Sequence, residues 1–390
     1  MPLGANRPGW RDIVATYVGA DVRRSLFQVV TTLTLLAIAF WAAYRALPWS
    51  LPLAVLLAIP TGGLLVRTFI LMHDCAHGSL FTSRRANDIV GAVTGVLTLT
   101  PFAQWRRDHA LHHASSGDLD RRGHGDVPTL TVREYLERTP RQRLAYRLTR
   151  HPASLLVVGP LYILFGQRIP PRGRSAKASD VASVLGTDAA IALLATATVL
   201  LFGWPALLLV YLPAYYIAAA SGIWIFYVQH QFEDAYWESH ATWDYATAAL
   251  RGSSHLELPR VLQWFTGSIG LHHIHHLAPR IPNYRLQSCH DANPLLQQAP
   301  KITLRSGSAA LRLALWDEDR GRLVRFADVA LQESDLAERA KHGAGSPTRH
   351  PEHSAGSPTG HPERGEGSAV VAPMSLESSD RGLASSAERG

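Results

Sequence analysis

The chain has 390 residues, of which 47% are hydrophobic and 18% are charged, below the charged fraction of about 25% in ordinary soluble proteins. Its net charge of +7 is carried mainly by arginines beside apolar stretches, which is typical of membrane proteins and argues against nucleic-acid binding. The two cysteines, Cys75 and Cys289, are too few and too far apart for a disulfide framework, so we expect a reducing, cytosol-facing site.

The chain begins with a polar segment, 1–25, which is predicted to be cytoplasmic. Four apolar runs follow it along the sequence, and each has the roughly 20 residues that a helix needs to cross a bilayer. They are residues 26–47, 51–72, 181–201 and 205–228. Short turns at 48–50 and 202–204 pair them into two hairpins. The predicted fold class is therefore an all-α integral membrane protein with four transmembrane helices.

Two shorter apolar stretches, 89–103 and 153–166, are predicted to lie at the membrane interface. Arginines precede the first run and fill the long loop from 73 to 180, whereas the turns carry none. This bias predicts that both termini and the long loop are cytoplasmic. The preference for arginine over lysine and the high alanine content favour a bacterial source, so we expect the bacterial inner membrane.

The C-terminal part of the sequence divides into two segments. Residues 229–335 are polar and rich in histidine, and they are predicted to form a helical cytoplasmic cap that completes a membrane domain of residues 26–335. From 340 to 390 the composition changes to Gly, Ser, Pro, Glu and Arg, and a nine-residue pattern at 344–352 recurs at 355–363. This composition predicts a disordered tail.

Three histidine clusters lie beside the apolar runs: His73–His77 (box one), His109–His113 (box two) and His272–His276 (box three). Imidazole is the commonest side-chain metal ligand. On a helix, residues at i, i+3 and i+4 lie on one side, so each box can direct two or three nitrogens towards one place. So many histidines exceed the needs of one ion. The clusters therefore predict a pair of metal ions at the membrane surface.

These clusters, in this order and with these membrane spacings, resemble those of the membrane-bound fatty acid desaturases, and further motifs extend the likeness to the acyl-lipid Δ12/ω3-like branch. Those motifs are Trp105–His109, Ser115–Asp118, Gly125–Thr131, Phe226–Glu233, Gly270–Leu277 and Arg280–Tyr284. The resemblance covers roughly residues 25–320.

The resemblance implies two Fe ions, with O2 as co-substrate and no catalytic residue separate from the metal site. The implied ligands are His73, His77, His109, His112, His113, His230, His272, His275 and His276. Metal-bound imidazoles usually donate their second N–H to a carboxylate or a carbonyl. Asp74 and Asp108 adjoin ligands and are expected to serve in this way, and His273 is expected to lie just behind the ligands.

The implied reaction introduces a cis double bond into an acyl chain, most simply that of a membrane lipid. No cytochrome b5-like or ferredoxin-like segment is visible in the sequence, so the two electrons are expected from a separate carrier such as a ferredoxin. The sequence leaves open the double-bond position, the acyl carrier, the identity of the donor, the oligomeric state and the role of the tail.

Other classes of protein fit the sequence less well. A related di-iron membrane hydroxylase or ketolase that acts on a carotenoid or another lipid remains an alternative, because one fold can host several chemistries. A metal transporter would place its ionisable ligands inside the spans, near the bilayer midplane, whereas these boxes lie beside polar sequence. A non-catalytic scaffold would have no use for the ligand set.

Overall fold

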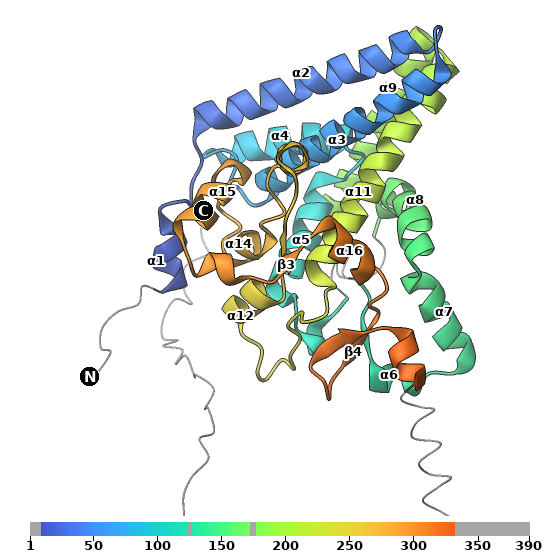
Figure 1. Ribbon diagram of the computed structural model, residues 1–390. Coiled ribbons are helices and arrows are strands. Elements are labelled where there is room, and N and C mark those ends of the chain that lie inside the picture. Colours follow the sequence, from blue (N-terminus) through green and yellow to red (C-terminus); the bar gives the residue numbers. More distant parts are fainter. Residues whose placement is uncertain (1–8, 124–126, 172–176, 332–390) are drawn as a thin grey trace, which may run out of the picture. The chain divides into compact units, whose positions relative to one another are not determined.

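The computed structural model describes residues 9–123, 127–171 and 177–331. It is mostly helical, as predicted (Figure 1). The predicted tail at 340–390 lies outside the described residues. The first hairpin joins α2 (Val22–Ala46) to α3 (Leu51–Ala76) and follows the short α1 (Trp10–Ala15). The side chain of Asp21 caps α2 by accepting hydrogen bonds from the backbone N–H groups of Arg23 and Arg24.

The second hairpin consists of α9 (Ala178–Phe202) followed by a helix in three parts: α10 (Trp204–Ala206), the π-helical η4 (Leu207–Tyr211) and α11 (Leu212–His230). Gly203 turns the chain between α9 and α10 with a φ of +80°, a conformation that favours glycine. The start of α9 and the end of α11 both reach α5 (Phe102–Ser115), so α9 and α11 run in opposite directions.

Among the described residues, three helical stretches are long and apolar enough to cross a membrane: Val22–Ala46, Leu51–Ala76 and Ala178–His230. The third has 53 residues and includes the turn at Gly203. A further pair, Pro140–Arg150 and Ser154–Arg168, qualifies only if it is counted as one span bent by 61°. This pair contains the stretch 153–166 that was predicted to lie at the interface.

Two helices extend beyond the apolar runs from which they were predicted. The runs 51–72 and 205–228 continue as helix to Ala76 and His230. Histidine and aspartate lower the hydropathy of the sequence, but they do not end a helix. As a result, His73 lies within the last turn of α3 instead of in a following loop, and His230 is the last residue of α11.

Short helices connect the two hairpins and complete the cap. Those between the hairpins are α4 (Arg84–Leu97), η1 (Leu119–Arg121), α6 (Val132–Leu136), α7 (Pro140–Arg150), η2 (Ser154–Val158), α8 (Gly159–Phe165) and η3 (Gly166–Arg168). Those after α11 are α12 (Tyr245–Arg251), α13 (Arg260–Phe265), α14 (His272–Leu277), α15 (Asn283–Ala292), η5 (Leu296–Gln298) and α16 (Leu304–Ala310).

The cap also contains strands, so the all-α prediction is wrong in this part. β1 (Leu130–Thr131) pairs in parallel with β4 (Leu315–Asp317), which pairs antiparallel with β5 (Arg322–Val324). β2 (His255–Leu256) pairs in parallel with β3 (Lys301–Ile302). Strands of two or three residues are too short to show the alternation of apolar and polar residues by which a strand is recognised in sequence.

Helix α3 lies at the centre of the helical core. α2, α4 and α11 pack around it, and Leu65, Leu71 and Met72 are almost fully buried. α11 continues from this core to the cap, where Tyr227 and Val228 pack with Trp316 and Leu323 of the small sheet. The histidine-bearing ends of α3 and α11 therefore meet between the helical core and the cap.

Candidate metal centre

The three boxes lie on three helices that meet at one place. Box one occupies the end of α3, box two the C-terminal part of α5, and box three all of α14. With 100° of rotation per residue, positions i and i+4 differ by about 40°, whereas adjacent positions i+3 and i+4 diverge by about 100°. A helical HxxHH box can therefore direct its first and last histidines to one site and the middle one to another.

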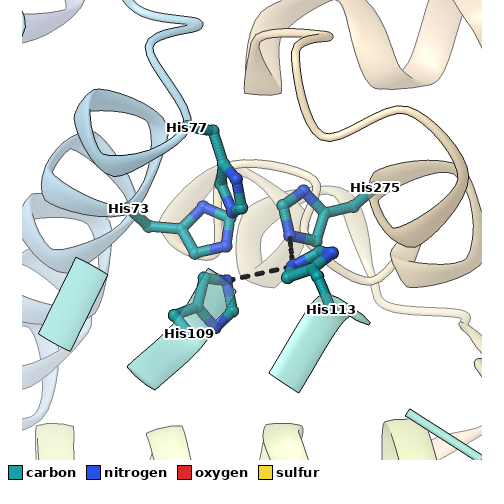
Figure 2. A group of neighbouring side chains, drawn as sticks. All are labelled: His73, His77, His109, His113 and His275. Carbon is teal, nitrogen blue, oxygen red and sulfur yellow. Dashed lines mark hydrogen bonds between the residues drawn. The ribbon is translucent and has the colours of Figure 1, made fainter. Parts of the chain in front are cut away.

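Nine histidines form two groups in this manner. The first group contains His73, His77, His109, His113 and His275, and their ligand atoms lie within 4.8 Å of one another. Figure 2 shows its five rings converging on one place from α3, α5 and α14. The second group contains His112, His230, His272 and His276, and it meets the same limit. Every predicted ligand belongs to one of the two groups.

Boxes two and three each contribute histidines to both groups. Box two gives its i, i+4 pair, His109 and His113, to the first group and His112 to the second. Box three does the reverse, giving its i, i+4 pair to the second group and His275 to the first. The groups adjoin each other, since the rings of His113 and His276 stack with centroids 4.1 Å apart. The arrangement therefore suits two ions side by side.

The distances between ring nitrogens fit metal coordination. Two imidazole nitrogens about 2.1 Å from one ion, at an angle of 90–109°, lie about 3.0–3.4 Å apart. In the first group the Nε2 atom of His113 lies 3.1 Å from that of His109 and 3.0 Å from that of His275. In the second group the Nε2 atom of His230 lies 3.2 Å from that of His112 and 3.0 Å from that of His272.

Two further ring nitrogens support this assignment. The buried Nε2 atoms of His77 and His276 have no hydrogen-bond partner among the residues that the structure describes. A buried polar atom without a partner is costly, and a metal ion in each group would satisfy it. The donor set is all imidazole, which suits iron, zinc or copper better than magnesium or calcium.

Burial favours the neutral, metal-binding form of the histidines that lie outside the candidate spans. Desolvation, followed by the repulsion of neighbouring imidazoles, lowers the pKa of His113, His275 and His276 well below the ordinary value of 6.5. Since the folded state binds these protons less readily than the unfolded state, stability is present above pH 6.5 and is lost as the pH falls below it.

The metal-depleted protein in detergent is therefore expected to unfold at a constant temperature above pH 7 and at progressively lower temperatures from pH 6.5 to 5. Each such histidine contributes roughly 1 kcal/mol per pH unit in that interval. Thermal unfolding followed by circular dichroism measures this slope, and His275→Asn should reduce it. An unfolding temperature that is independent of pH over this range would contradict the assignment of these histidines as buried and neutral.

Asp74 supports box one from behind. Its Oδ1 atom lies 3.4 Å from Nδ1 of His73, and its Oδ2 atom accepts hydrogen bonds from the backbone and side-chain nitrogens of Asn283, at 2.8 and 2.9 Å. The Asn283 amide in turn exchanges two hydrogen bonds with the amide of Gln28 on α2. The carboxylate is buried and is held by Asn283 of α15, which is itself held by Gln28 of α2. It can therefore fix the ring of His73.

The structure places the other two predicted supporting residues elsewhere. Asp108 is 44% exposed in its side chain and pairs with Arg107, whose guanidinium also bonds Asp180 of α9. These contacts anchor α5 on α9. His273 is fully buried, and its Nε2 atom bonds the carbonyl of Leu296 at 2.8 Å, on the other side of α14 from the two groups. Asp108 was predicted because it adjoins a ligand, and His273 because, with His276, it gives box three a second possible spacing.

Asp74→Asn is expected to weaken metal retention by about 10- to 100-fold, the usual penalty for losing an outer hydrogen-bonding partner. The amide N–H of the substituted side chain would face the N–H donors of Asn283 and could not accept their hydrogen bonds. Iron per protein after graded chelation measures the effect, with Asp108→Asn as the matched control that retains its iron. Equal retention in the two variants would remove Asp74 from the support of box one.

The contacts of two aromatic side chains with the ligands were not predicted. The ring of Trp105 stacks on His109 with centroids 4.3 Å apart and an interplanar angle of 21°. Phe226 lies against both His112 and His230, with centroids 5.2 and 5.1 Å away. Both aromatics stand four residues before a ligand, at Trp105–His109 and Phe226–His230, and this i, i+4 spacing is the signal that could have identified them.

Comparison with known proteins agrees with this geometry. The family model described as fatty acid desaturase matches residues 46–306. A fatty acid desaturase of Bacillus subtilis (strain 168) is 43% identical over 317 residues, which cover 81% of this chain and 90% of that protein. The sn-1 oleoyl-lipid 12-desaturase of Anabaena variabilis is 26% identical over 68% of this chain and 75% of its own length. The chloroplastic omega-6 fatty acid desaturase of Spinacia oleracea is 27% identical over 78% and 68%.

Proposed function

Because the chain belongs to the fatty acid desaturase family and is thus an oxidoreductase of fatty acyl chains, we propose that it introduces a cis double bond into the acyl chain of a membrane lipid, with O2 and two electrons, at two iron ions. The observation that carries this proposal is the division of nine buried or half-buried histidines into two adjoining groups. The relative that is named an oleoyl-lipid desaturase favours a lipid as the acyl carrier.

The proposed reaction removes two hydrogens from adjacent methylenes. O2 accepts these two hydrogens together with two electrons and two protons from outside, and it is reduced to two water molecules. Two iron ions, when bound, would activate O2, the oxidant of this step, which no protein side chain can do. The histidines would hold the ions, Asp74 orients His73, and Trp105 fixes the ring plane of His109. Burial of the second group excludes bulk water from the place where it would hold an ion.

We also propose four membrane crossings, made by α2, α3, α9 and the α10–α11 helix, with both termini and all three boxes on the cytoplasmic side. The lengths and apolar character of these helices support the crossings. The ends of α3 and α11 that carry ligands meet at the two groups, as a shared cytoplasmic site requires. The net charge of +7 suits an acidic electron carrier such as a ferredoxin as the separate donor.

The test is the fatty acid profile of a bacterial host that expresses the chain, with double bonds located by mass spectrometry. A new unsaturated acid identifies the reaction, and its double-bond position gives the regiochemistry. An unchanged profile, with iron-loaded protein and a reductant present, would overturn the proposal and favour hydroxylation of another lipid. Analysing intact lipids separately from the acyl-CoA and carrier-protein pools identifies the acyl carrier.

A further inference from the structure

Residues 258–268 were predicted to belong to a polar cap, but they carry an apolar segment that returns to the helical core. This segment contains α13 and lies between β2 and box three. In Figure 1 it is the gold part of the chain that leaves the cap and lies beside α3. Its side chains include Leu258, Val261, Leu262, Trp264 and Phe265.

The segment covers one half of α3. In its first half α3 exposes Leu51, Leu53, Val55, Leu56 and Ile59, each by at least 43%. From Thr61 to Cys75 nearly every residue is buried. The ring of Phe265 packs so closely on Gly63 that an added Cβ atom would lie 2.7 Å from Phe265 Cδ1. Where the second half of α3 is buried, α13 therefore takes over the apolar exposed surface that the first half of α3 begins.

An arginine fixes the depth of α13. Arg67 of α3 donates to the carbonyl of Trp264 and, at 3.1 Å, to Oγ1 of Thr32 on α2, and its guanidinium lies 4.3 Å from the centroid of the Trp264 ring. Arg67 precedes His73 by six residues, or about 9 Å along the helix. α13 therefore lies about one and a half turns below box one, beside the apolar part of a candidate span.

The outward face of α13 is apolar at this depth. Val261 is 66% exposed, and Leu262 and Trp264 are each 41% exposed. Arg260, at the first residue of α13, is also exposed and can reach the lipid headgroups with its long side chain. Tryptophan and arginine beside exposed aliphatic side chains are typical of a segment that lies in the membrane interface.

We propose that residues 258–268 re-enter the membrane and that Val261, Leu262 and Trp264 contact lipid acyl chains. The proposal rests on the crossing of the bilayer by α3. Box three begins seven residues after Phe265, so this contact brings the lipid surface beside the ligands of α14. The polar cap is thereby held at a fixed height above the acyl chains on which the enzyme acts.

The experiment places an environment-sensitive fluorophore on single added cysteines in full-length protein reconstituted into phosphatidylcholine vesicles. Val261→Cys tests α13, Ile59→Cys tests the exposed face of α3, and Ala241→Cys tests an exposed loop of the cap. Both native cysteines are buried, and the unaltered chain measures their background labelling. The quenchers are iodide in water and a phosphatidylcholine with a nitroxide on its acyl chain near the ester.

The probe at Val261 is expected to lose most of its emission to the nitroxide lipid and little to iodide, as at Ile59, while Ala241 shows the opposite. Quenching of Val261 by iodide alone, with Ile59 still quenched by lipid, would overturn the re-entrant segment and leave the crossing of α3 intact. Quenching of both by iodide would overturn the crossing as well. Since no turnover is measured, neither result depends on desaturase activity.

Discussion

The His275→Ala variant is expected to insert into the membrane at the normal level and to form no detectable unsaturated product. His275 is the single box-three member of the first group, with its Nε2 atom 3.0 Å from that of His113 and its ring centroid 4.3 Å from that of His73. Loss of a direct ligand should exceed the penalty of about 10- to 100-fold for an outer partner. Insertion is spared because His275 lies on α14, outside the candidate spans.

Product is measured by mass spectrometry of total fatty acids, and iron is measured per purified protein. The variant should retain about one of two irons, because the second group keeps all its histidines. His151→Ala is the matched control, since His151 is exposed and stands apart from both groups. Full iron and full product in His275→Ala would separate box three from the first metal site.

A second large effect is expected from two neighbouring histidines. His272→Ala should lose the iron of the second group and all detectable product, whereas His273→Ala should keep both. The Nε2 atom of His272 lies 3.0 Å from that of His230, but His273 bonds Leu296 and packs near His255 and His290. Box three can be read with its first ligand at His272 or at His273, and this pair of variants distinguishes the two readings.

Both side chains are buried, so loss of stability alone would affect the two variants alike. His273→Ala leaves the Leu296 carbonyl without its donor, at a cost of about 1–3 kcal/mol, and its unfolding temperature should fall. Iron content per folded protein separates that effect from ligand loss. If His273→Ala released iron while His272→Ala retained it, the second group would have to be reassigned.

The histidine boxes were recognisable because they repeat a local pattern. The i, i+4 spacing of box one and the i, i+3, i+4 spacing of boxes two and three predicted metal ligands in each box, and the resemblance to the desaturases implied which eight box histidines they are. His230 has no such spacing around it, and only the resemblance of the Phe226–Glu233 stretch to a family pointed to it. The two hairpins followed from run lengths and from the short turns at 48–50 and 202–204.

Contacts between distant parts of the chain were not predictable. Asp74 and Asp108 each adjoin a ligand, and only the approach of Asn283, 209 positions further along the chain, distinguishes them. The strands of the cap exist because β1 and β4 meet across more than 180 positions. The environment of α13 depends on Gly63 and Arg67 of α3, so a window of sequence around residue 260 could not reveal it.

By itself the sequence predicted which histidines would form the candidate metal centre, since ligand chemistry and helical spacing are local properties. Only the tertiary structure decided which histidine belongs to which group. In boxes two and three the adjacent i+3 and i+4 positions point about 100° apart on their helix, and each then joins whatever nitrogens the other helices bring to that side. His112 and His275 thus join opposite groups, although both are the middle histidine of an HxxHH box, because α5 and α14 approach the centre from different directions.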